Sequence, residues 1–455
     1  MNRTMDLSQS FKAYDVRGRI PDELNPDAVY RIGRAFAAWL KPRRVAVGRD
    51  IRHSSEEFAN ALTSGLTESG VDVVDIGLCG TECVYFATSS LELDGGIMVT
   101  ASHNPPDYNG LKFVREQAKP VSGDTGLQEI RRIAETGEFA DPARAGRVEA
   151  VDVRAAWRGH VLSYVDTAKL RPLSIVCNAG NGGAGDYVDL LEDGLPFRFT
   201  KIHHEADGDF PNGVPNPMIE ENREVTARHV RLSRADLGIA FDGDFDRCFF
   251  FYEEGRFIDG YYIVGLLAST FLEQHKGAPI VHDPRVVWNT QQVVRAAGGR
   301  AVQCKSGHAF MKACMRKADA VYGGEMSGHH YFRNFAYCDS GMIPWVVISA
   351  LLSRTGKTLS SLVDERMKAF PSSGEINRRI GDVSGAIEAV RQRYRPGAVR
   401  LEEVDGLSIE HTRWRFNLRS SNTEPLVRLN VESRGEPVLM HEKTAEILGV
   451  LDQFT

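Results

Sequence analysis

The stretch GIMVTASHNPP, residues 96–106, holds the pattern from which the rest of the chain can be read. Its first half, residues 96–100, is apolar and partly β-branched, and it predicts a buried strand. Its second half is polar and ends in a proline pair, which cannot continue a strand. We therefore expect Ser102, His103 and Asn104 on a loop at the end of a strand, with Lys112 further along the chain.

The same order of elements occurs three times. The first copy has strands at 44–47, 71–76 and 96–100 and a helix at 54–69. The second has strands at 173–176, 197–202 and 237–241, a helix at 186–191, and DGDFDR after its last strand. The third has strands at 279–281, 300–304 and 320–322, a helix at 289–297, and GGEMSGHHYF after its last strand. Alternating strands and helices are typical of mostly parallel α/β sheets, in which functional residues follow the carboxyl ends of the strands.

The last part of the chain has a different pattern. Strands are expected at 374–380, 407–410, 414–418 and 426–431, and helices at 386–394 and 440–451, which indicates a small α+β domain. The predicted fold is therefore α/β, with three similar mixed-sheet α/β domains and a C-terminal α+β domain around a central cleft. The expected domains are residues 1–148, 149–254, 255–368 and 369–455.

Composition restricts the class of protein. The 455 residues are 42% hydrophobic and 25% charged, with a net charge of −6 and no block of Lys or Arg, which argues against nucleic acid or an anionic membrane as a partner. The N-terminus has no apolar signal segment, and the longest apolar runs, 261–272 and 342–352, are too short to span a bilayer. The seven cysteines lack metal-ligand spacing, and Cys79 and Cys83 are expected to be buried thiols. These features predict a reduced, cytoplasmic protein.

The motif DGDFDR indicates a metal site. Asp242, Asp244 and Asp246 alternate with other residues, so they converge on a turn after a strand but not on one face of a helix. Three carboxylates in five residues repel one another unless a cation lies among them, and hard oxygen ligands suit Mg²⁺ or Ca²⁺. A solvated acidic turn is the simpler alternative. Since Mg²⁺ usually also binds a phosphate oxygen, we expect a phosphate partner, and Arg247 beside the motif can hold an anion.

Ser102 is the candidate to carry that phosphate. The sequence does not contain the G-x-S-x-G elbow of a hydrolase at this point, and adjacency in sequence alone does not bring His103 to the serine hydroxyl. A serine that only caps a turn would be the simpler interpretation if the loop stood alone. With a metal site on an equivalent loop, a phosphorylated Ser102 would complete the Mg²⁺ shell, and Lys112 would serve as a charge clamp or a proton shuttle.

Two further clusters predict a sugar phosphate as the ligand. Glu325, Ser327, His329 and His330 can hydrogen-bond the hydroxyls of a sugar. The loop RSSNTEP, residues 419–425, with Arg428 nearby, combines neutral donors with arginine and is suited to an anion. The glycines of residues 178–185 match neither nucleotide-binding motif and are expected to form a tight turn.

Five motifs now occur together: KAYDVRG at 12–18, TASHNP at 100–105, DGDFDR at 242–247, GEMSGH at 324–329 and RSSNTEP at 419–425. With them the chain resembles the α-D-phosphohexomutase family, and within it the phosphomannomutase/phosphoglucomutase branch, over nearly its whole length. The neighbouring stretches FDGDFDRCFFF and FAYCDSGMIPW are similar to those of bacterial enzymes that supply surface-polysaccharide precursors.

The resemblance implies a role for each motif. Ser102 would be the phosphoserine and would hold Mg²⁺ together with Asp242, Asp244 and Asp246. The candidate catalytic residues, acid–base or charge-stabilising, are Ser102, Arg17, His103, Lys112, Arg247 and His329. Glu325 and Ser327 would bind sugar hydroxyls. The non-reacting phosphate would be held by Arg419, Ser421, Asn422, Thr423 and Arg428, and the cleft would be lined by Tyr14, Arg285, Lys305 and His308. Arg285 stands where some relatives carry Lys.

The implied reaction is the reversible transfer of phosphate between C6 and C1 of mannose and glucose phosphates through a hexose 1,6-bisphosphate. Small-molecule hexose phosphates would be the partners, and the chain would be a monomer or a weak dimer. Three alternatives stay open. A phosphoglucosamine mutase typically has GEQSGH where this chain has Met326, a metal-dependent sugar phosphatase needs no second phosphate site, and a non-catalytic sugar-phosphate binding protein has no need for the aspartates.

Overall fold

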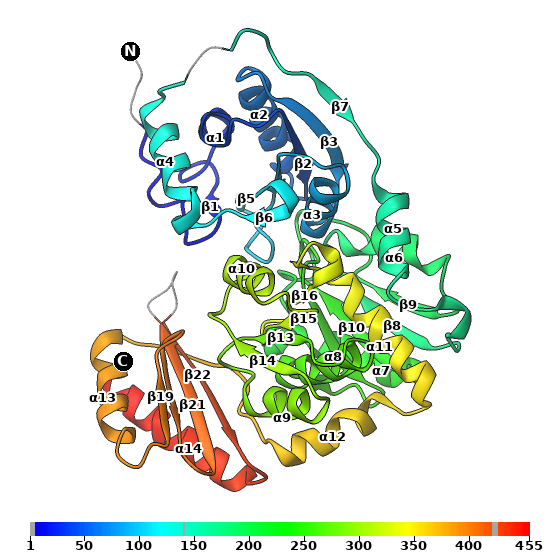
Figure 1. The fold of residues 1–455 in the computed structure, drawn as a ribbon, viewed down its shortest axis with the longest axis vertical. Helices are drawn as coiled ribbons and strands as arrows, with labels where there is room; N and C mark the ends of the chain where they lie inside the picture. Colours follow the sequence, from blue (N-terminus) through cyan, green and yellow to red (C-terminus); the bar gives the residue numbers. More distant parts are fainter. Residues whose placement is uncertain (1–4, 140–141, 421–425) are drawn as a thin grey trace. The chain divides into compact units, whose positions relative to one another are not determined.

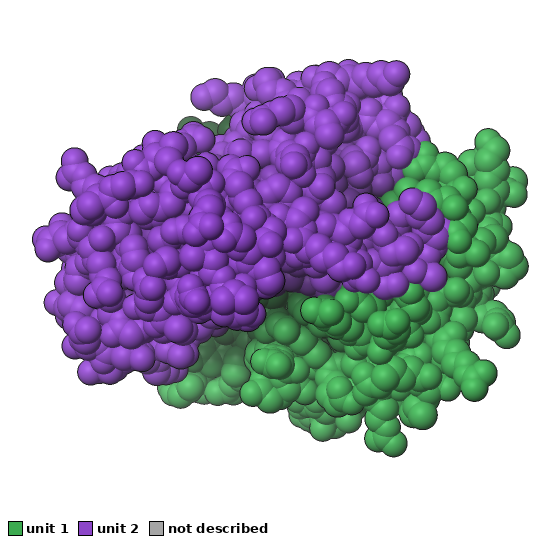
Figure 2. All heavy atoms as spheres, turned by 90° about the horizontal axis from the view of Figure 1, so that it is seen from below, with its two compact units in different colours: residues 1–257, 332–356 green, residues 258–331, 357–455 purple. Residues whose placement is uncertain are grey.

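The computed structural model describes residues 5–139, 142–420 and 426–455. The chain forms two compact units, coloured separately in Figure 2. Unit 1 comprises Met1–Phe257 and Phe332–Gly356, and unit 2 comprises Ile258–Tyr331 and Lys357–Thr455.

The first sheet of unit 1 has the strand order β1-β5-β4-β2-β3-β7, with β6 paired to β5 (Figure 1). Strand β2 is parallel to β3 and β4, whereas β5 is antiparallel to β4 and β1. The strands are β1 (Val16–Arg19), β2 (Arg44–Arg49), β3 (Asp72–Leu78), β4 (Gly95–Val99), β5 (Tyr108–Arg115), β6 (Lys119–Pro120) and β7 (Val148–Ala150). The helices are α1 (Pro26–Leu40), α2 (Ser55–Thr67), α3 (Thr81–Ser90) and α4 (Leu127–Thr136).

The second sheet of unit 1 has the order β12-β11-β10-β8-β9. Strand β10 is parallel to β8 and antiparallel to β11. The strands are β8 (Ser174–Asn178), β9 (Arg198–Ile202), β10 (Leu237–Phe241), β11 (Cys248–Tyr252) and β12 (Phe257–Ile258). The helices are α5 (Arg154–Leu162), α6 (Ala184–Glu192), α7 (Glu224–Ser233) and α11 (Met342–Thr355), and the short strand β17 (Cys338–Asp339) precedes α11.

Unit 2 contains the strand order β14-β13-β15-β16, in which β13 is parallel to both β14 and β15. The strands are β13 (Pro279–His282), β14 (Arg300–Gln303), β15 (Tyr322–Gly324) and β16 (His330–Phe332). The helices are α8 (Gly260–Gln274), α9 (Trp288–Ala296), α10 (His308–Ala318) and α12 (Leu359–Ala369).

The C-terminal part of unit 2 is an antiparallel sheet in the order β18-β22-β21-β20-β19, with two helices beside it (Figure 1). The elements are β18 (Ile376–Arg379), β19 (Arg400–Glu402), β20 (Leu407–Glu410), β21 (Trp414–Ser420), β22 (Leu426–Ser433), α13 (Val383–Tyr394) and α14 (Pro437–Leu451). Side chains from both helices and from the sheet share one apolar core, which includes Val390, Phe416 and Ile447. The register places Arg419 of β21 directly opposite Arg428 of β22.

The predicted repeat is present in the strand order. Strands β4, β10 and β15 occupy equivalent positions, each between a parallel neighbour (β2, β8 or β13) and a strand that extends the sheet (β5, β11 or β16). The serine, aspartate and GGEMSGHHYF clusters singled out in the three repeats each follow one of these strands. The predicted fold class, three mixed α/β sheets and a C-terminal α+β domain, is confirmed.

The sequence patterns did not identify the strands that extend the first two sheets, β5 and β11. Strand β5 is the more important one because Lys112 lies on it, opposite Met98 of β4. It begins with Tyr-Asn-Gly, which is typical of a turn. For this reason the alternation of apolar and polar residues did not predict the strand. Within the part of the chain that the structure describes, no helix combines the length and the apolar character needed to cross a membrane.

Candidate active site

The serine loop, residues 100–105, begins where β4 ends. Ser102 is buried and has a φ of 51°, in the left-handed region that non-glycine residues seldom adopt. Its amide donates a hydrogen bond to Thr100 Oγ1 at 2.9 Å, which stabilises the tight turn. Strained residues of this kind gather at functional sites, where the surrounding structure holds them in place.

Arg52 fixes the backbone of the serine loop through hydrogen bonds. Its guanidinium is buried and donates to four backbone carbonyls, those of Ser102 (2.9 Å), Asn104 (2.6 Å), Pro105 (2.6 Å) and Tyr108 (2.9 Å). The sequence analysis gave Arg52 no role. Its signal was present but weak, since Arg52 follows the polar loop at the end of β2, on the edge of the sheet where parallel strands end.

The aspartate loop, residues 242–247, follows β10 and meets the serine loop. Ser102 Oγ donates a hydrogen bond to Asp242 Oδ2 at 2.8 Å. One oxygen from each of Asp242, Asp244 and Asp246 lies within 4.8 Å of the others, and all three carboxylates are buried. Gly243 is required between them, because a Cβ at this position would lie 2.5 Å from the carbonyl oxygen of Ser102. The glycine-rich turn expected at 178–185 contacts the same loop, with the Gly183 amide donating to Gly243 O at 3.0 Å.

Two cations accompany the aspartates. Lys112 Nζ donates to Asp244 Oδ2 at 2.6 Å and to Asp246 Oδ2 at 2.7 Å, and Arg247 Nε lies 3.4 Å from Asp242 Oδ2. Burial opposes the charged form of Lys112, but Asp244 and Asp246 outweigh it and raise the pKa of this amine. Lys112 therefore stays protonated at neutral pH, which favours the charge clamp over the proton shuttle among the two roles expected for it.

The aspartate loop has the donor set of a divalent-cation site. Burial raises the pKa of Asp242 to about 7, and Asp246 and Asp244 add to the effect by repulsion. Asp244 Oδ2 accepts hydrogen bonds from Thr81 and Lys112, whereas Asp244 Oδ1 is buried without a hydrogen-bond partner among the described residues. A buried carboxylate oxygen in this condition is costly unless a cation binds it. Three clustered carboxylates and a serine oxygen fit Mg²⁺, which prefers oxygen ligands.

His103 is closer to the serine than its position in the sequence implied. Its Nδ1 lies 3.0 Å from Ser102 Oγ, because the left-handed turn at Ser102 brings the two neighbouring side chains together. The pKa of His103 is lowered, chiefly by burial and further by Arg247, Arg17 and Lys112. The ring is therefore neutral at physiological pH and can exchange a hydrogen bond with the serine oxygen.

The N-terminal motif also reaches the serine loop. Arg17 Nη1 donates to Asn104 Oδ1 at 2.7 Å, and its Nε donates to Asp15 at 2.8 Å. Burial opposes the charge of Arg17, but Asp15, Tyr14 and Asp244 together raise the pKa of its guanidinium. Tyr14 is half-buried. Unit 1 thus brings together all of its predicted catalytic and metal-ligating residues.

The sugar-binding candidates lie in unit 2, after β15. Glu325 Oε1 accepts a hydrogen bond from the Gly307 amide at 2.7 Å, and its Oε2 accepts one from the Tyr331 hydroxyl at 2.5 Å. Ser327 Oγ lies 3.2 Å from His329 Nδ1. The remaining candidate of this cluster, His330, is turned elsewhere, since its Nδ1 bonds the Tyr322 hydroxyl at 2.7 Å.

Lys305 and His308 occupy the segment between β14 and α10. Lys305 is exposed, with its Nζ 4.8 Å from the centre of the Phe310 ring. His308 is the first residue of α10 and its Nδ1 lies 3.3 Å from Lys312 Nζ. Both residues stand within a few positions of Gly307, which bonds Glu325, so the segment and the sugar-binding loop share a contact.

An arginine cluster, formed by Arg285, Arg419 and Arg428, surrounds a single buried carboxylate in unit 2. Glu375 Oε2 accepts hydrogen bonds from Arg285 Nη1 at 2.8 Å and Arg419 Nη2 at 3.3 Å, and its Oε1 accepts one from Arg428 Nη1 at 3.4 Å. Burial opposes ionisation of Glu375, but Arg285, Arg419 and Arg428 outweigh it and lower its pKa to about 2. The cluster is therefore ionised throughout the physiological range.

Glu375 and Asp283 are the residues of this cluster that sequence reasoning missed. Asp283 Oδ2 accepts from Arg285 Nε at 3.0 Å and also from the amide of Met326 at 3.1 Å, which links Arg285 to the sugar-binding loop. The predicted phosphate-binding residues Ser421, Asn422 and Thr423 lie outside the described residues.

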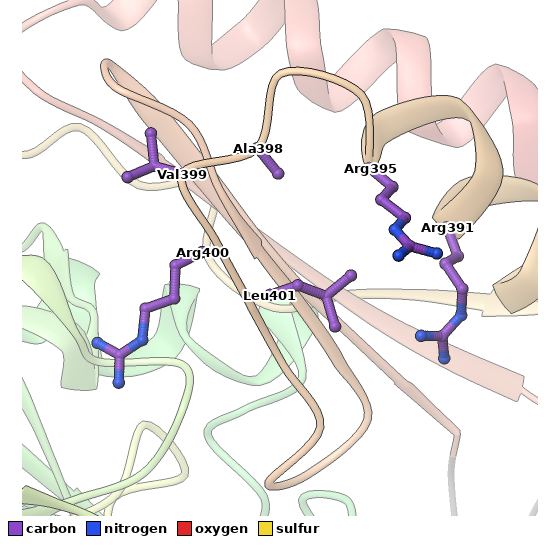
Figure 3. Close-up of a pocket in the computed structure, with 6 residues that line it drawn as sticks. All are labelled: Arg391, Arg395, Ala398, Val399, Arg400 and Leu401. Carbon is purple, nitrogen blue, oxygen red and sulfur yellow. The ribbon is translucent and has the colours of Figure 1, made fainter.

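A separate hollow lies in the C-terminal domain (Figure 3). It is lined by Arg391, Arg395, Ala398, Val399, Arg400 and Leu401, none of which belongs to a predicted site. Two of its three arginines are already ion-paired, Arg391 with Glu403 and Arg400 with Glu402. The hollow therefore offers little free positive charge for a ligand.

Comparisons with known proteins agree with this arrangement. Models of the phosphoglucomutase/phosphomannomutase alpha/beta/alpha domains I, II and III match residues 8–141, 156–255 and 259–370, and that of the C-terminal domain matches 375–449. The chain is 56% identical to a phosphomannomutase of Escherichia coli, covering 97% of this chain and 98% of that protein. It is also 56% identical to a protein of Xanthomonas campestris named phosphohexose mutases, covering 97% and 99%.

A crystal structure of a family protein from Burkholderia thailandensis superimposes with a TM-score of 0.88 at 32% identity, covering 98% of both chains. Four domain models matched in order and relatives aligned over almost their full length leave no part of the fold unaccounted for. The chain belongs to the phosphoglucomutase/phosphomannomutase family.

Proposed function

We propose that the chain is a phosphohexose mutase that moves a phosphoryl group reversibly between C6 and C1 of mannose and glucose monophosphates. The observation that carries the proposal is the contact between Ser102 Oγ and Asp242 Oδ2, 2.8 Å apart, within a buried set of three carboxylates. A hydroxyl fixed beside a candidate metal site is placed to carry a phosphate. A serine with only a structural role would not require three buried carboxylates beside it.

In the proposed reaction Ser102 carries a phosphate in the resting enzyme. The free hydroxyl of a hexose monophosphate attacks that phosphorus, the bond to Ser102 Oγ breaks, and a hexose 1,6-bisphosphate forms. The bisphosphate then turns over, the other phosphate returns to Ser102, and the isomeric monophosphate leaves. Positioning and neutralisation of charge supply most of the catalysis in phosphoryl transfer. His103, whose neutral ring has its Nδ1 3.0 Å from Ser102 Oγ, can exchange a proton at the serine oxygen.

Asp242, Asp244 and Asp246 would hold Mg²⁺ together with an oxygen of the phosphoserine. Bound there, the ion would supply neutralisation of charge on the transferring phosphoryl group. The chain's own cations complete the balance: Lys112 stays charged between Asp244 and Asp246, and Arg17 orients Asn104 of the serine loop.

Unit 2 would bind the sugar and the phosphate that is not reacting. Glu325 and Ser327 would hydrogen-bond the sugar hydroxyls, and His329 would be an acid–base or charge-stabilising group next to them. The phosphate would be held by Arg419, Arg428, Ser421, Asn422 and Thr423. Tyr14, Arg285, Lys305 and His308 would contact the substrate at its edges. In this proposal the four domains have the boundaries expected from the sequence, and the product supplies nucleotide-sugar precursors of surface polysaccharide.

The test is an NMR assay of the purified chain with mannose 1-phosphate and a trace of glucose 1,6-bisphosphate. We expect mannose 6-phosphate to appear and intact mass with peptide mapping to place one phosphate on Ser102. Ser102→Ala should lower turnover by roughly 10³-fold or more, as removal of a covalent nucleophile does. Ser233→Ala, which changes an exposed serine, is the matched control.

Two results would contradict the proposal. Full activity in Ser102→Ala would exclude the phosphoserine route, whereas a small residual rate would not, since water or a neighbouring group can substitute weakly. Release of inorganic phosphate without the isomeric sugar phosphate would identify a phosphatase instead.

A further inference from the structure

Two cysteines flank the segment that carries Lys305 and His308. Cys304 follows β14 directly, and Cys314 lies in the middle of α10, so the nine residues between them include the turn before the helix and its first turns. The backbone amide of Cys304 is tied to His282 O of β13 at 2.9 Å. The first cysteine is therefore fixed to the sheet and the second to the helix.

The side chains of the two cysteines converge. Cys304 Sγ donates a hydrogen bond to the carbonyl oxygen of Phe310 at 3.4 Å. Phe310 stands four residues before Cys314, and residues four apart share one face of a helix, so this carbonyl lies under the Cys314 side chain.

We propose that Cys304 and Cys314 form a reversible disulfide when a low-molecular-weight disulfide is present, and that this modification restrains the segment between β14 and α10. Of the seven cysteines, Cys314 alone is half-buried and the other six are buried, so only this pair has a member that an oxidant can reach. Cys79 and Cys83 form a second close pair, but both are fully enclosed.

The chemistry of the pair suits this exchange. Interaction with the Cys304 thiol lowers the pKa of the Cys314 thiol to about 7, with Lys317 adding to the effect and burial opposing it. The same interaction, together with burial, raises the pKa of the Cys304 thiol. Cys314 is therefore the attacking thiolate near neutral pH, and Cys304 is the resolving thiol, as in other asymmetric dithiols.

The steps balance with a disulfide RSSR as the oxidant. The Cys314 thiolate attacks one sulfur of RSSR, a Cys314–SR bond forms, and RS⁻ leaves and takes up a proton. Cys304 then loses its proton and attacks Cys314 Sγ, which forms the Cys304–Cys314 bond and releases the second RS⁻. Two electrons pass from the two cysteines to RSSR, which is reduced to two RSH.

The disulfide would have a local consequence. Once oxidised, Cys304 has no S–H and cannot donate to Phe310 O, so the first turn of α10 loses one contact with the end of β14. Phe310 also lies under the Lys305 amine, and Gly307 in the same segment donates to Glu325. We therefore expect oxidation to lower mutase turnover several-fold. This expectation rests on the function proposed above, whereas the formation of the disulfide does not.

The test uses the full-length reduced protein incubated with glutathione disulfide, quenched with N-ethylmaleimide and digested with trypsin. The expected product is a disulfide-linked pair of peptides, 301–305 (AVQCK) and 313–316 (ACMR), which dithiothreitol separates. Cys304→Ser and Cys314→Ser should each abolish the linked pair, and Cys79→Ser should leave it unchanged. Formation in the wild-type chain should accelerate as pH rises through about 7, because the Cys314 thiolate is the attacking group.

Three outcomes would overturn the inference. Glutathione held on Cys314 without the linked peptides would mean that Cys304 does not resolve it. No reaction at Cys314 after prolonged incubation would exclude the exchange altogether. Complete linkage with unchanged turnover would exclude the restraint on the segment, while linkage with several-fold lower turnover that dithiothreitol restores would support it.

Discussion

The two charged centres of the molecule are opposites in composition. In unit 1 three buried carboxylates, Asp242, Asp244 and Asp246, are accompanied by Lys112 and Arg247. In unit 2 three arginines, Arg285, Arg419 and Arg428, are accompanied by Glu375 and Asp283. Further carboxylates also lie near the second centre, since Glu325 is 3.7 Å from Arg285 and Asp405 is 4.0 Å from Arg419.

The difference shows what each centre lacks. Asp244 Oδ1 is buried without a hydrogen-bond partner among the described residues, and the pKa of Asp242 is raised to about 7 mainly by burial, so the aspartate loop is complete only with a cation. The arginine cluster depresses the pKa of Glu375 to about 2, so this carboxylate stays ionised at neutral pH. In the proposed function a divalent cation binds at the first centre and a phosphate of the sugar binds at the second.

Removing the carboxylate from the arginine cluster should have the largest effect. Glu375→Gln leaves three guanidinium groups without their shared counter-charge, and loss of one partner from a buried ion pair typically costs about 3–5 kcal/mol. We expect a lower free energy of unfolding, measured by denaturant titration at pH 7, and a higher KM because the arginines lose their orientation. Glu442→Gln, at an exposed glutamate, is the control. A lower KM would show instead that Glu375 competes with phosphate for the arginines.

The pH dependence of that variant follows from the sign of the shift. The folded-state pKa of Glu375 is depressed to about 2 from 4.5, so the contribution of its ionised form is fully present above about pH 4.5 and is lost as the pH falls toward 2. The difference in stability between the wild-type chain and Glu375→Gln should therefore narrow between pH 5 and pH 3. If the difference in unfolding free energy stayed constant over that range, the arginines would not lower the pKa of Glu375.

Changing the opposite centre should weaken its binding of a cation. Asp244→Asn removes one charge from the set, and we expect turnover to fall roughly 100-fold and the Mg²⁺-induced rise in Tm to shrink. Asp22→Asn, at an exposed aspartate, is the control and should keep both properties. Unchanged turnover after removal of divalent cations with a chelator would contradict the assignment of the aspartate loop.

Arg419→Ala should mainly affect binding. Arg419 lies opposite Arg428 in the β21–β22 pair and would hold the phosphate that is not reacting, in the ground state and in the transition state alike. Uniform binding of this kind appears in KM, and a hydrogen bond to a charged group is worth about 1.5–3 kcal/mol, so KM should rise about tenfold or more. Arg400→Ala, in the same sheet but exposed, is the control. A collapsed kcat with an unchanged KM would move Arg419 to the reacting centre.

The smallest effect should be the difference between mannose and glucose 1-phosphates. A sugar that binds in two orientations roughly exchanges O3 and O4, so Glu325 and Ser327 can read both, whereas C2 has no equivalent partner after the flip. Mannose and glucose differ only at C2 and should have similar kcat/KM. Galactose differs at C4, where an unpaired polar group costs about 1–3 kcal/mol, and should be disfavoured roughly tenfold or more. A preference above a hundredfold between mannose and glucose would contradict this account.

The comparison of the two centres also shows what a sequence can and cannot reveal. The aspartate loop could be predicted because its three carboxylates lie within five residues and follow a strand that is apolar throughout. The succession of strands and helices in the three α/β repeats could be predicted for the same reason, since strand, loop and helix follow one another locally, but the strands β5 and β11 that extend the sheets were missed. Ser102 and His103 were found together, but their 3.0 Å contact depends on a backbone φ of 51° that no residue pattern specifies.

Glu375 could not be predicted because its partners are far away in the chain. It is a single acidic residue in the polar segment PSSGEINRR, and it meets Arg285 and Arg419 only when separate strands of unit 2 are assembled. Arg52 was missed for a related reason. All four of its acceptors are backbone carbonyls, which leave no trace in the identity of the residues that bear them.

The four hydrogen bonds from Arg52 limit the conformational freedom of the serine loop. Fixing the backbone of one residue costs about 1–2 kcal/mol in conformational entropy. A loop tethered at residues 102, 104, 105 and 108 has lost that freedom during folding, before any substrate arrives. The serine loop is therefore already ordered when substrate binds, and none of the binding energy of the sugar is needed to order it.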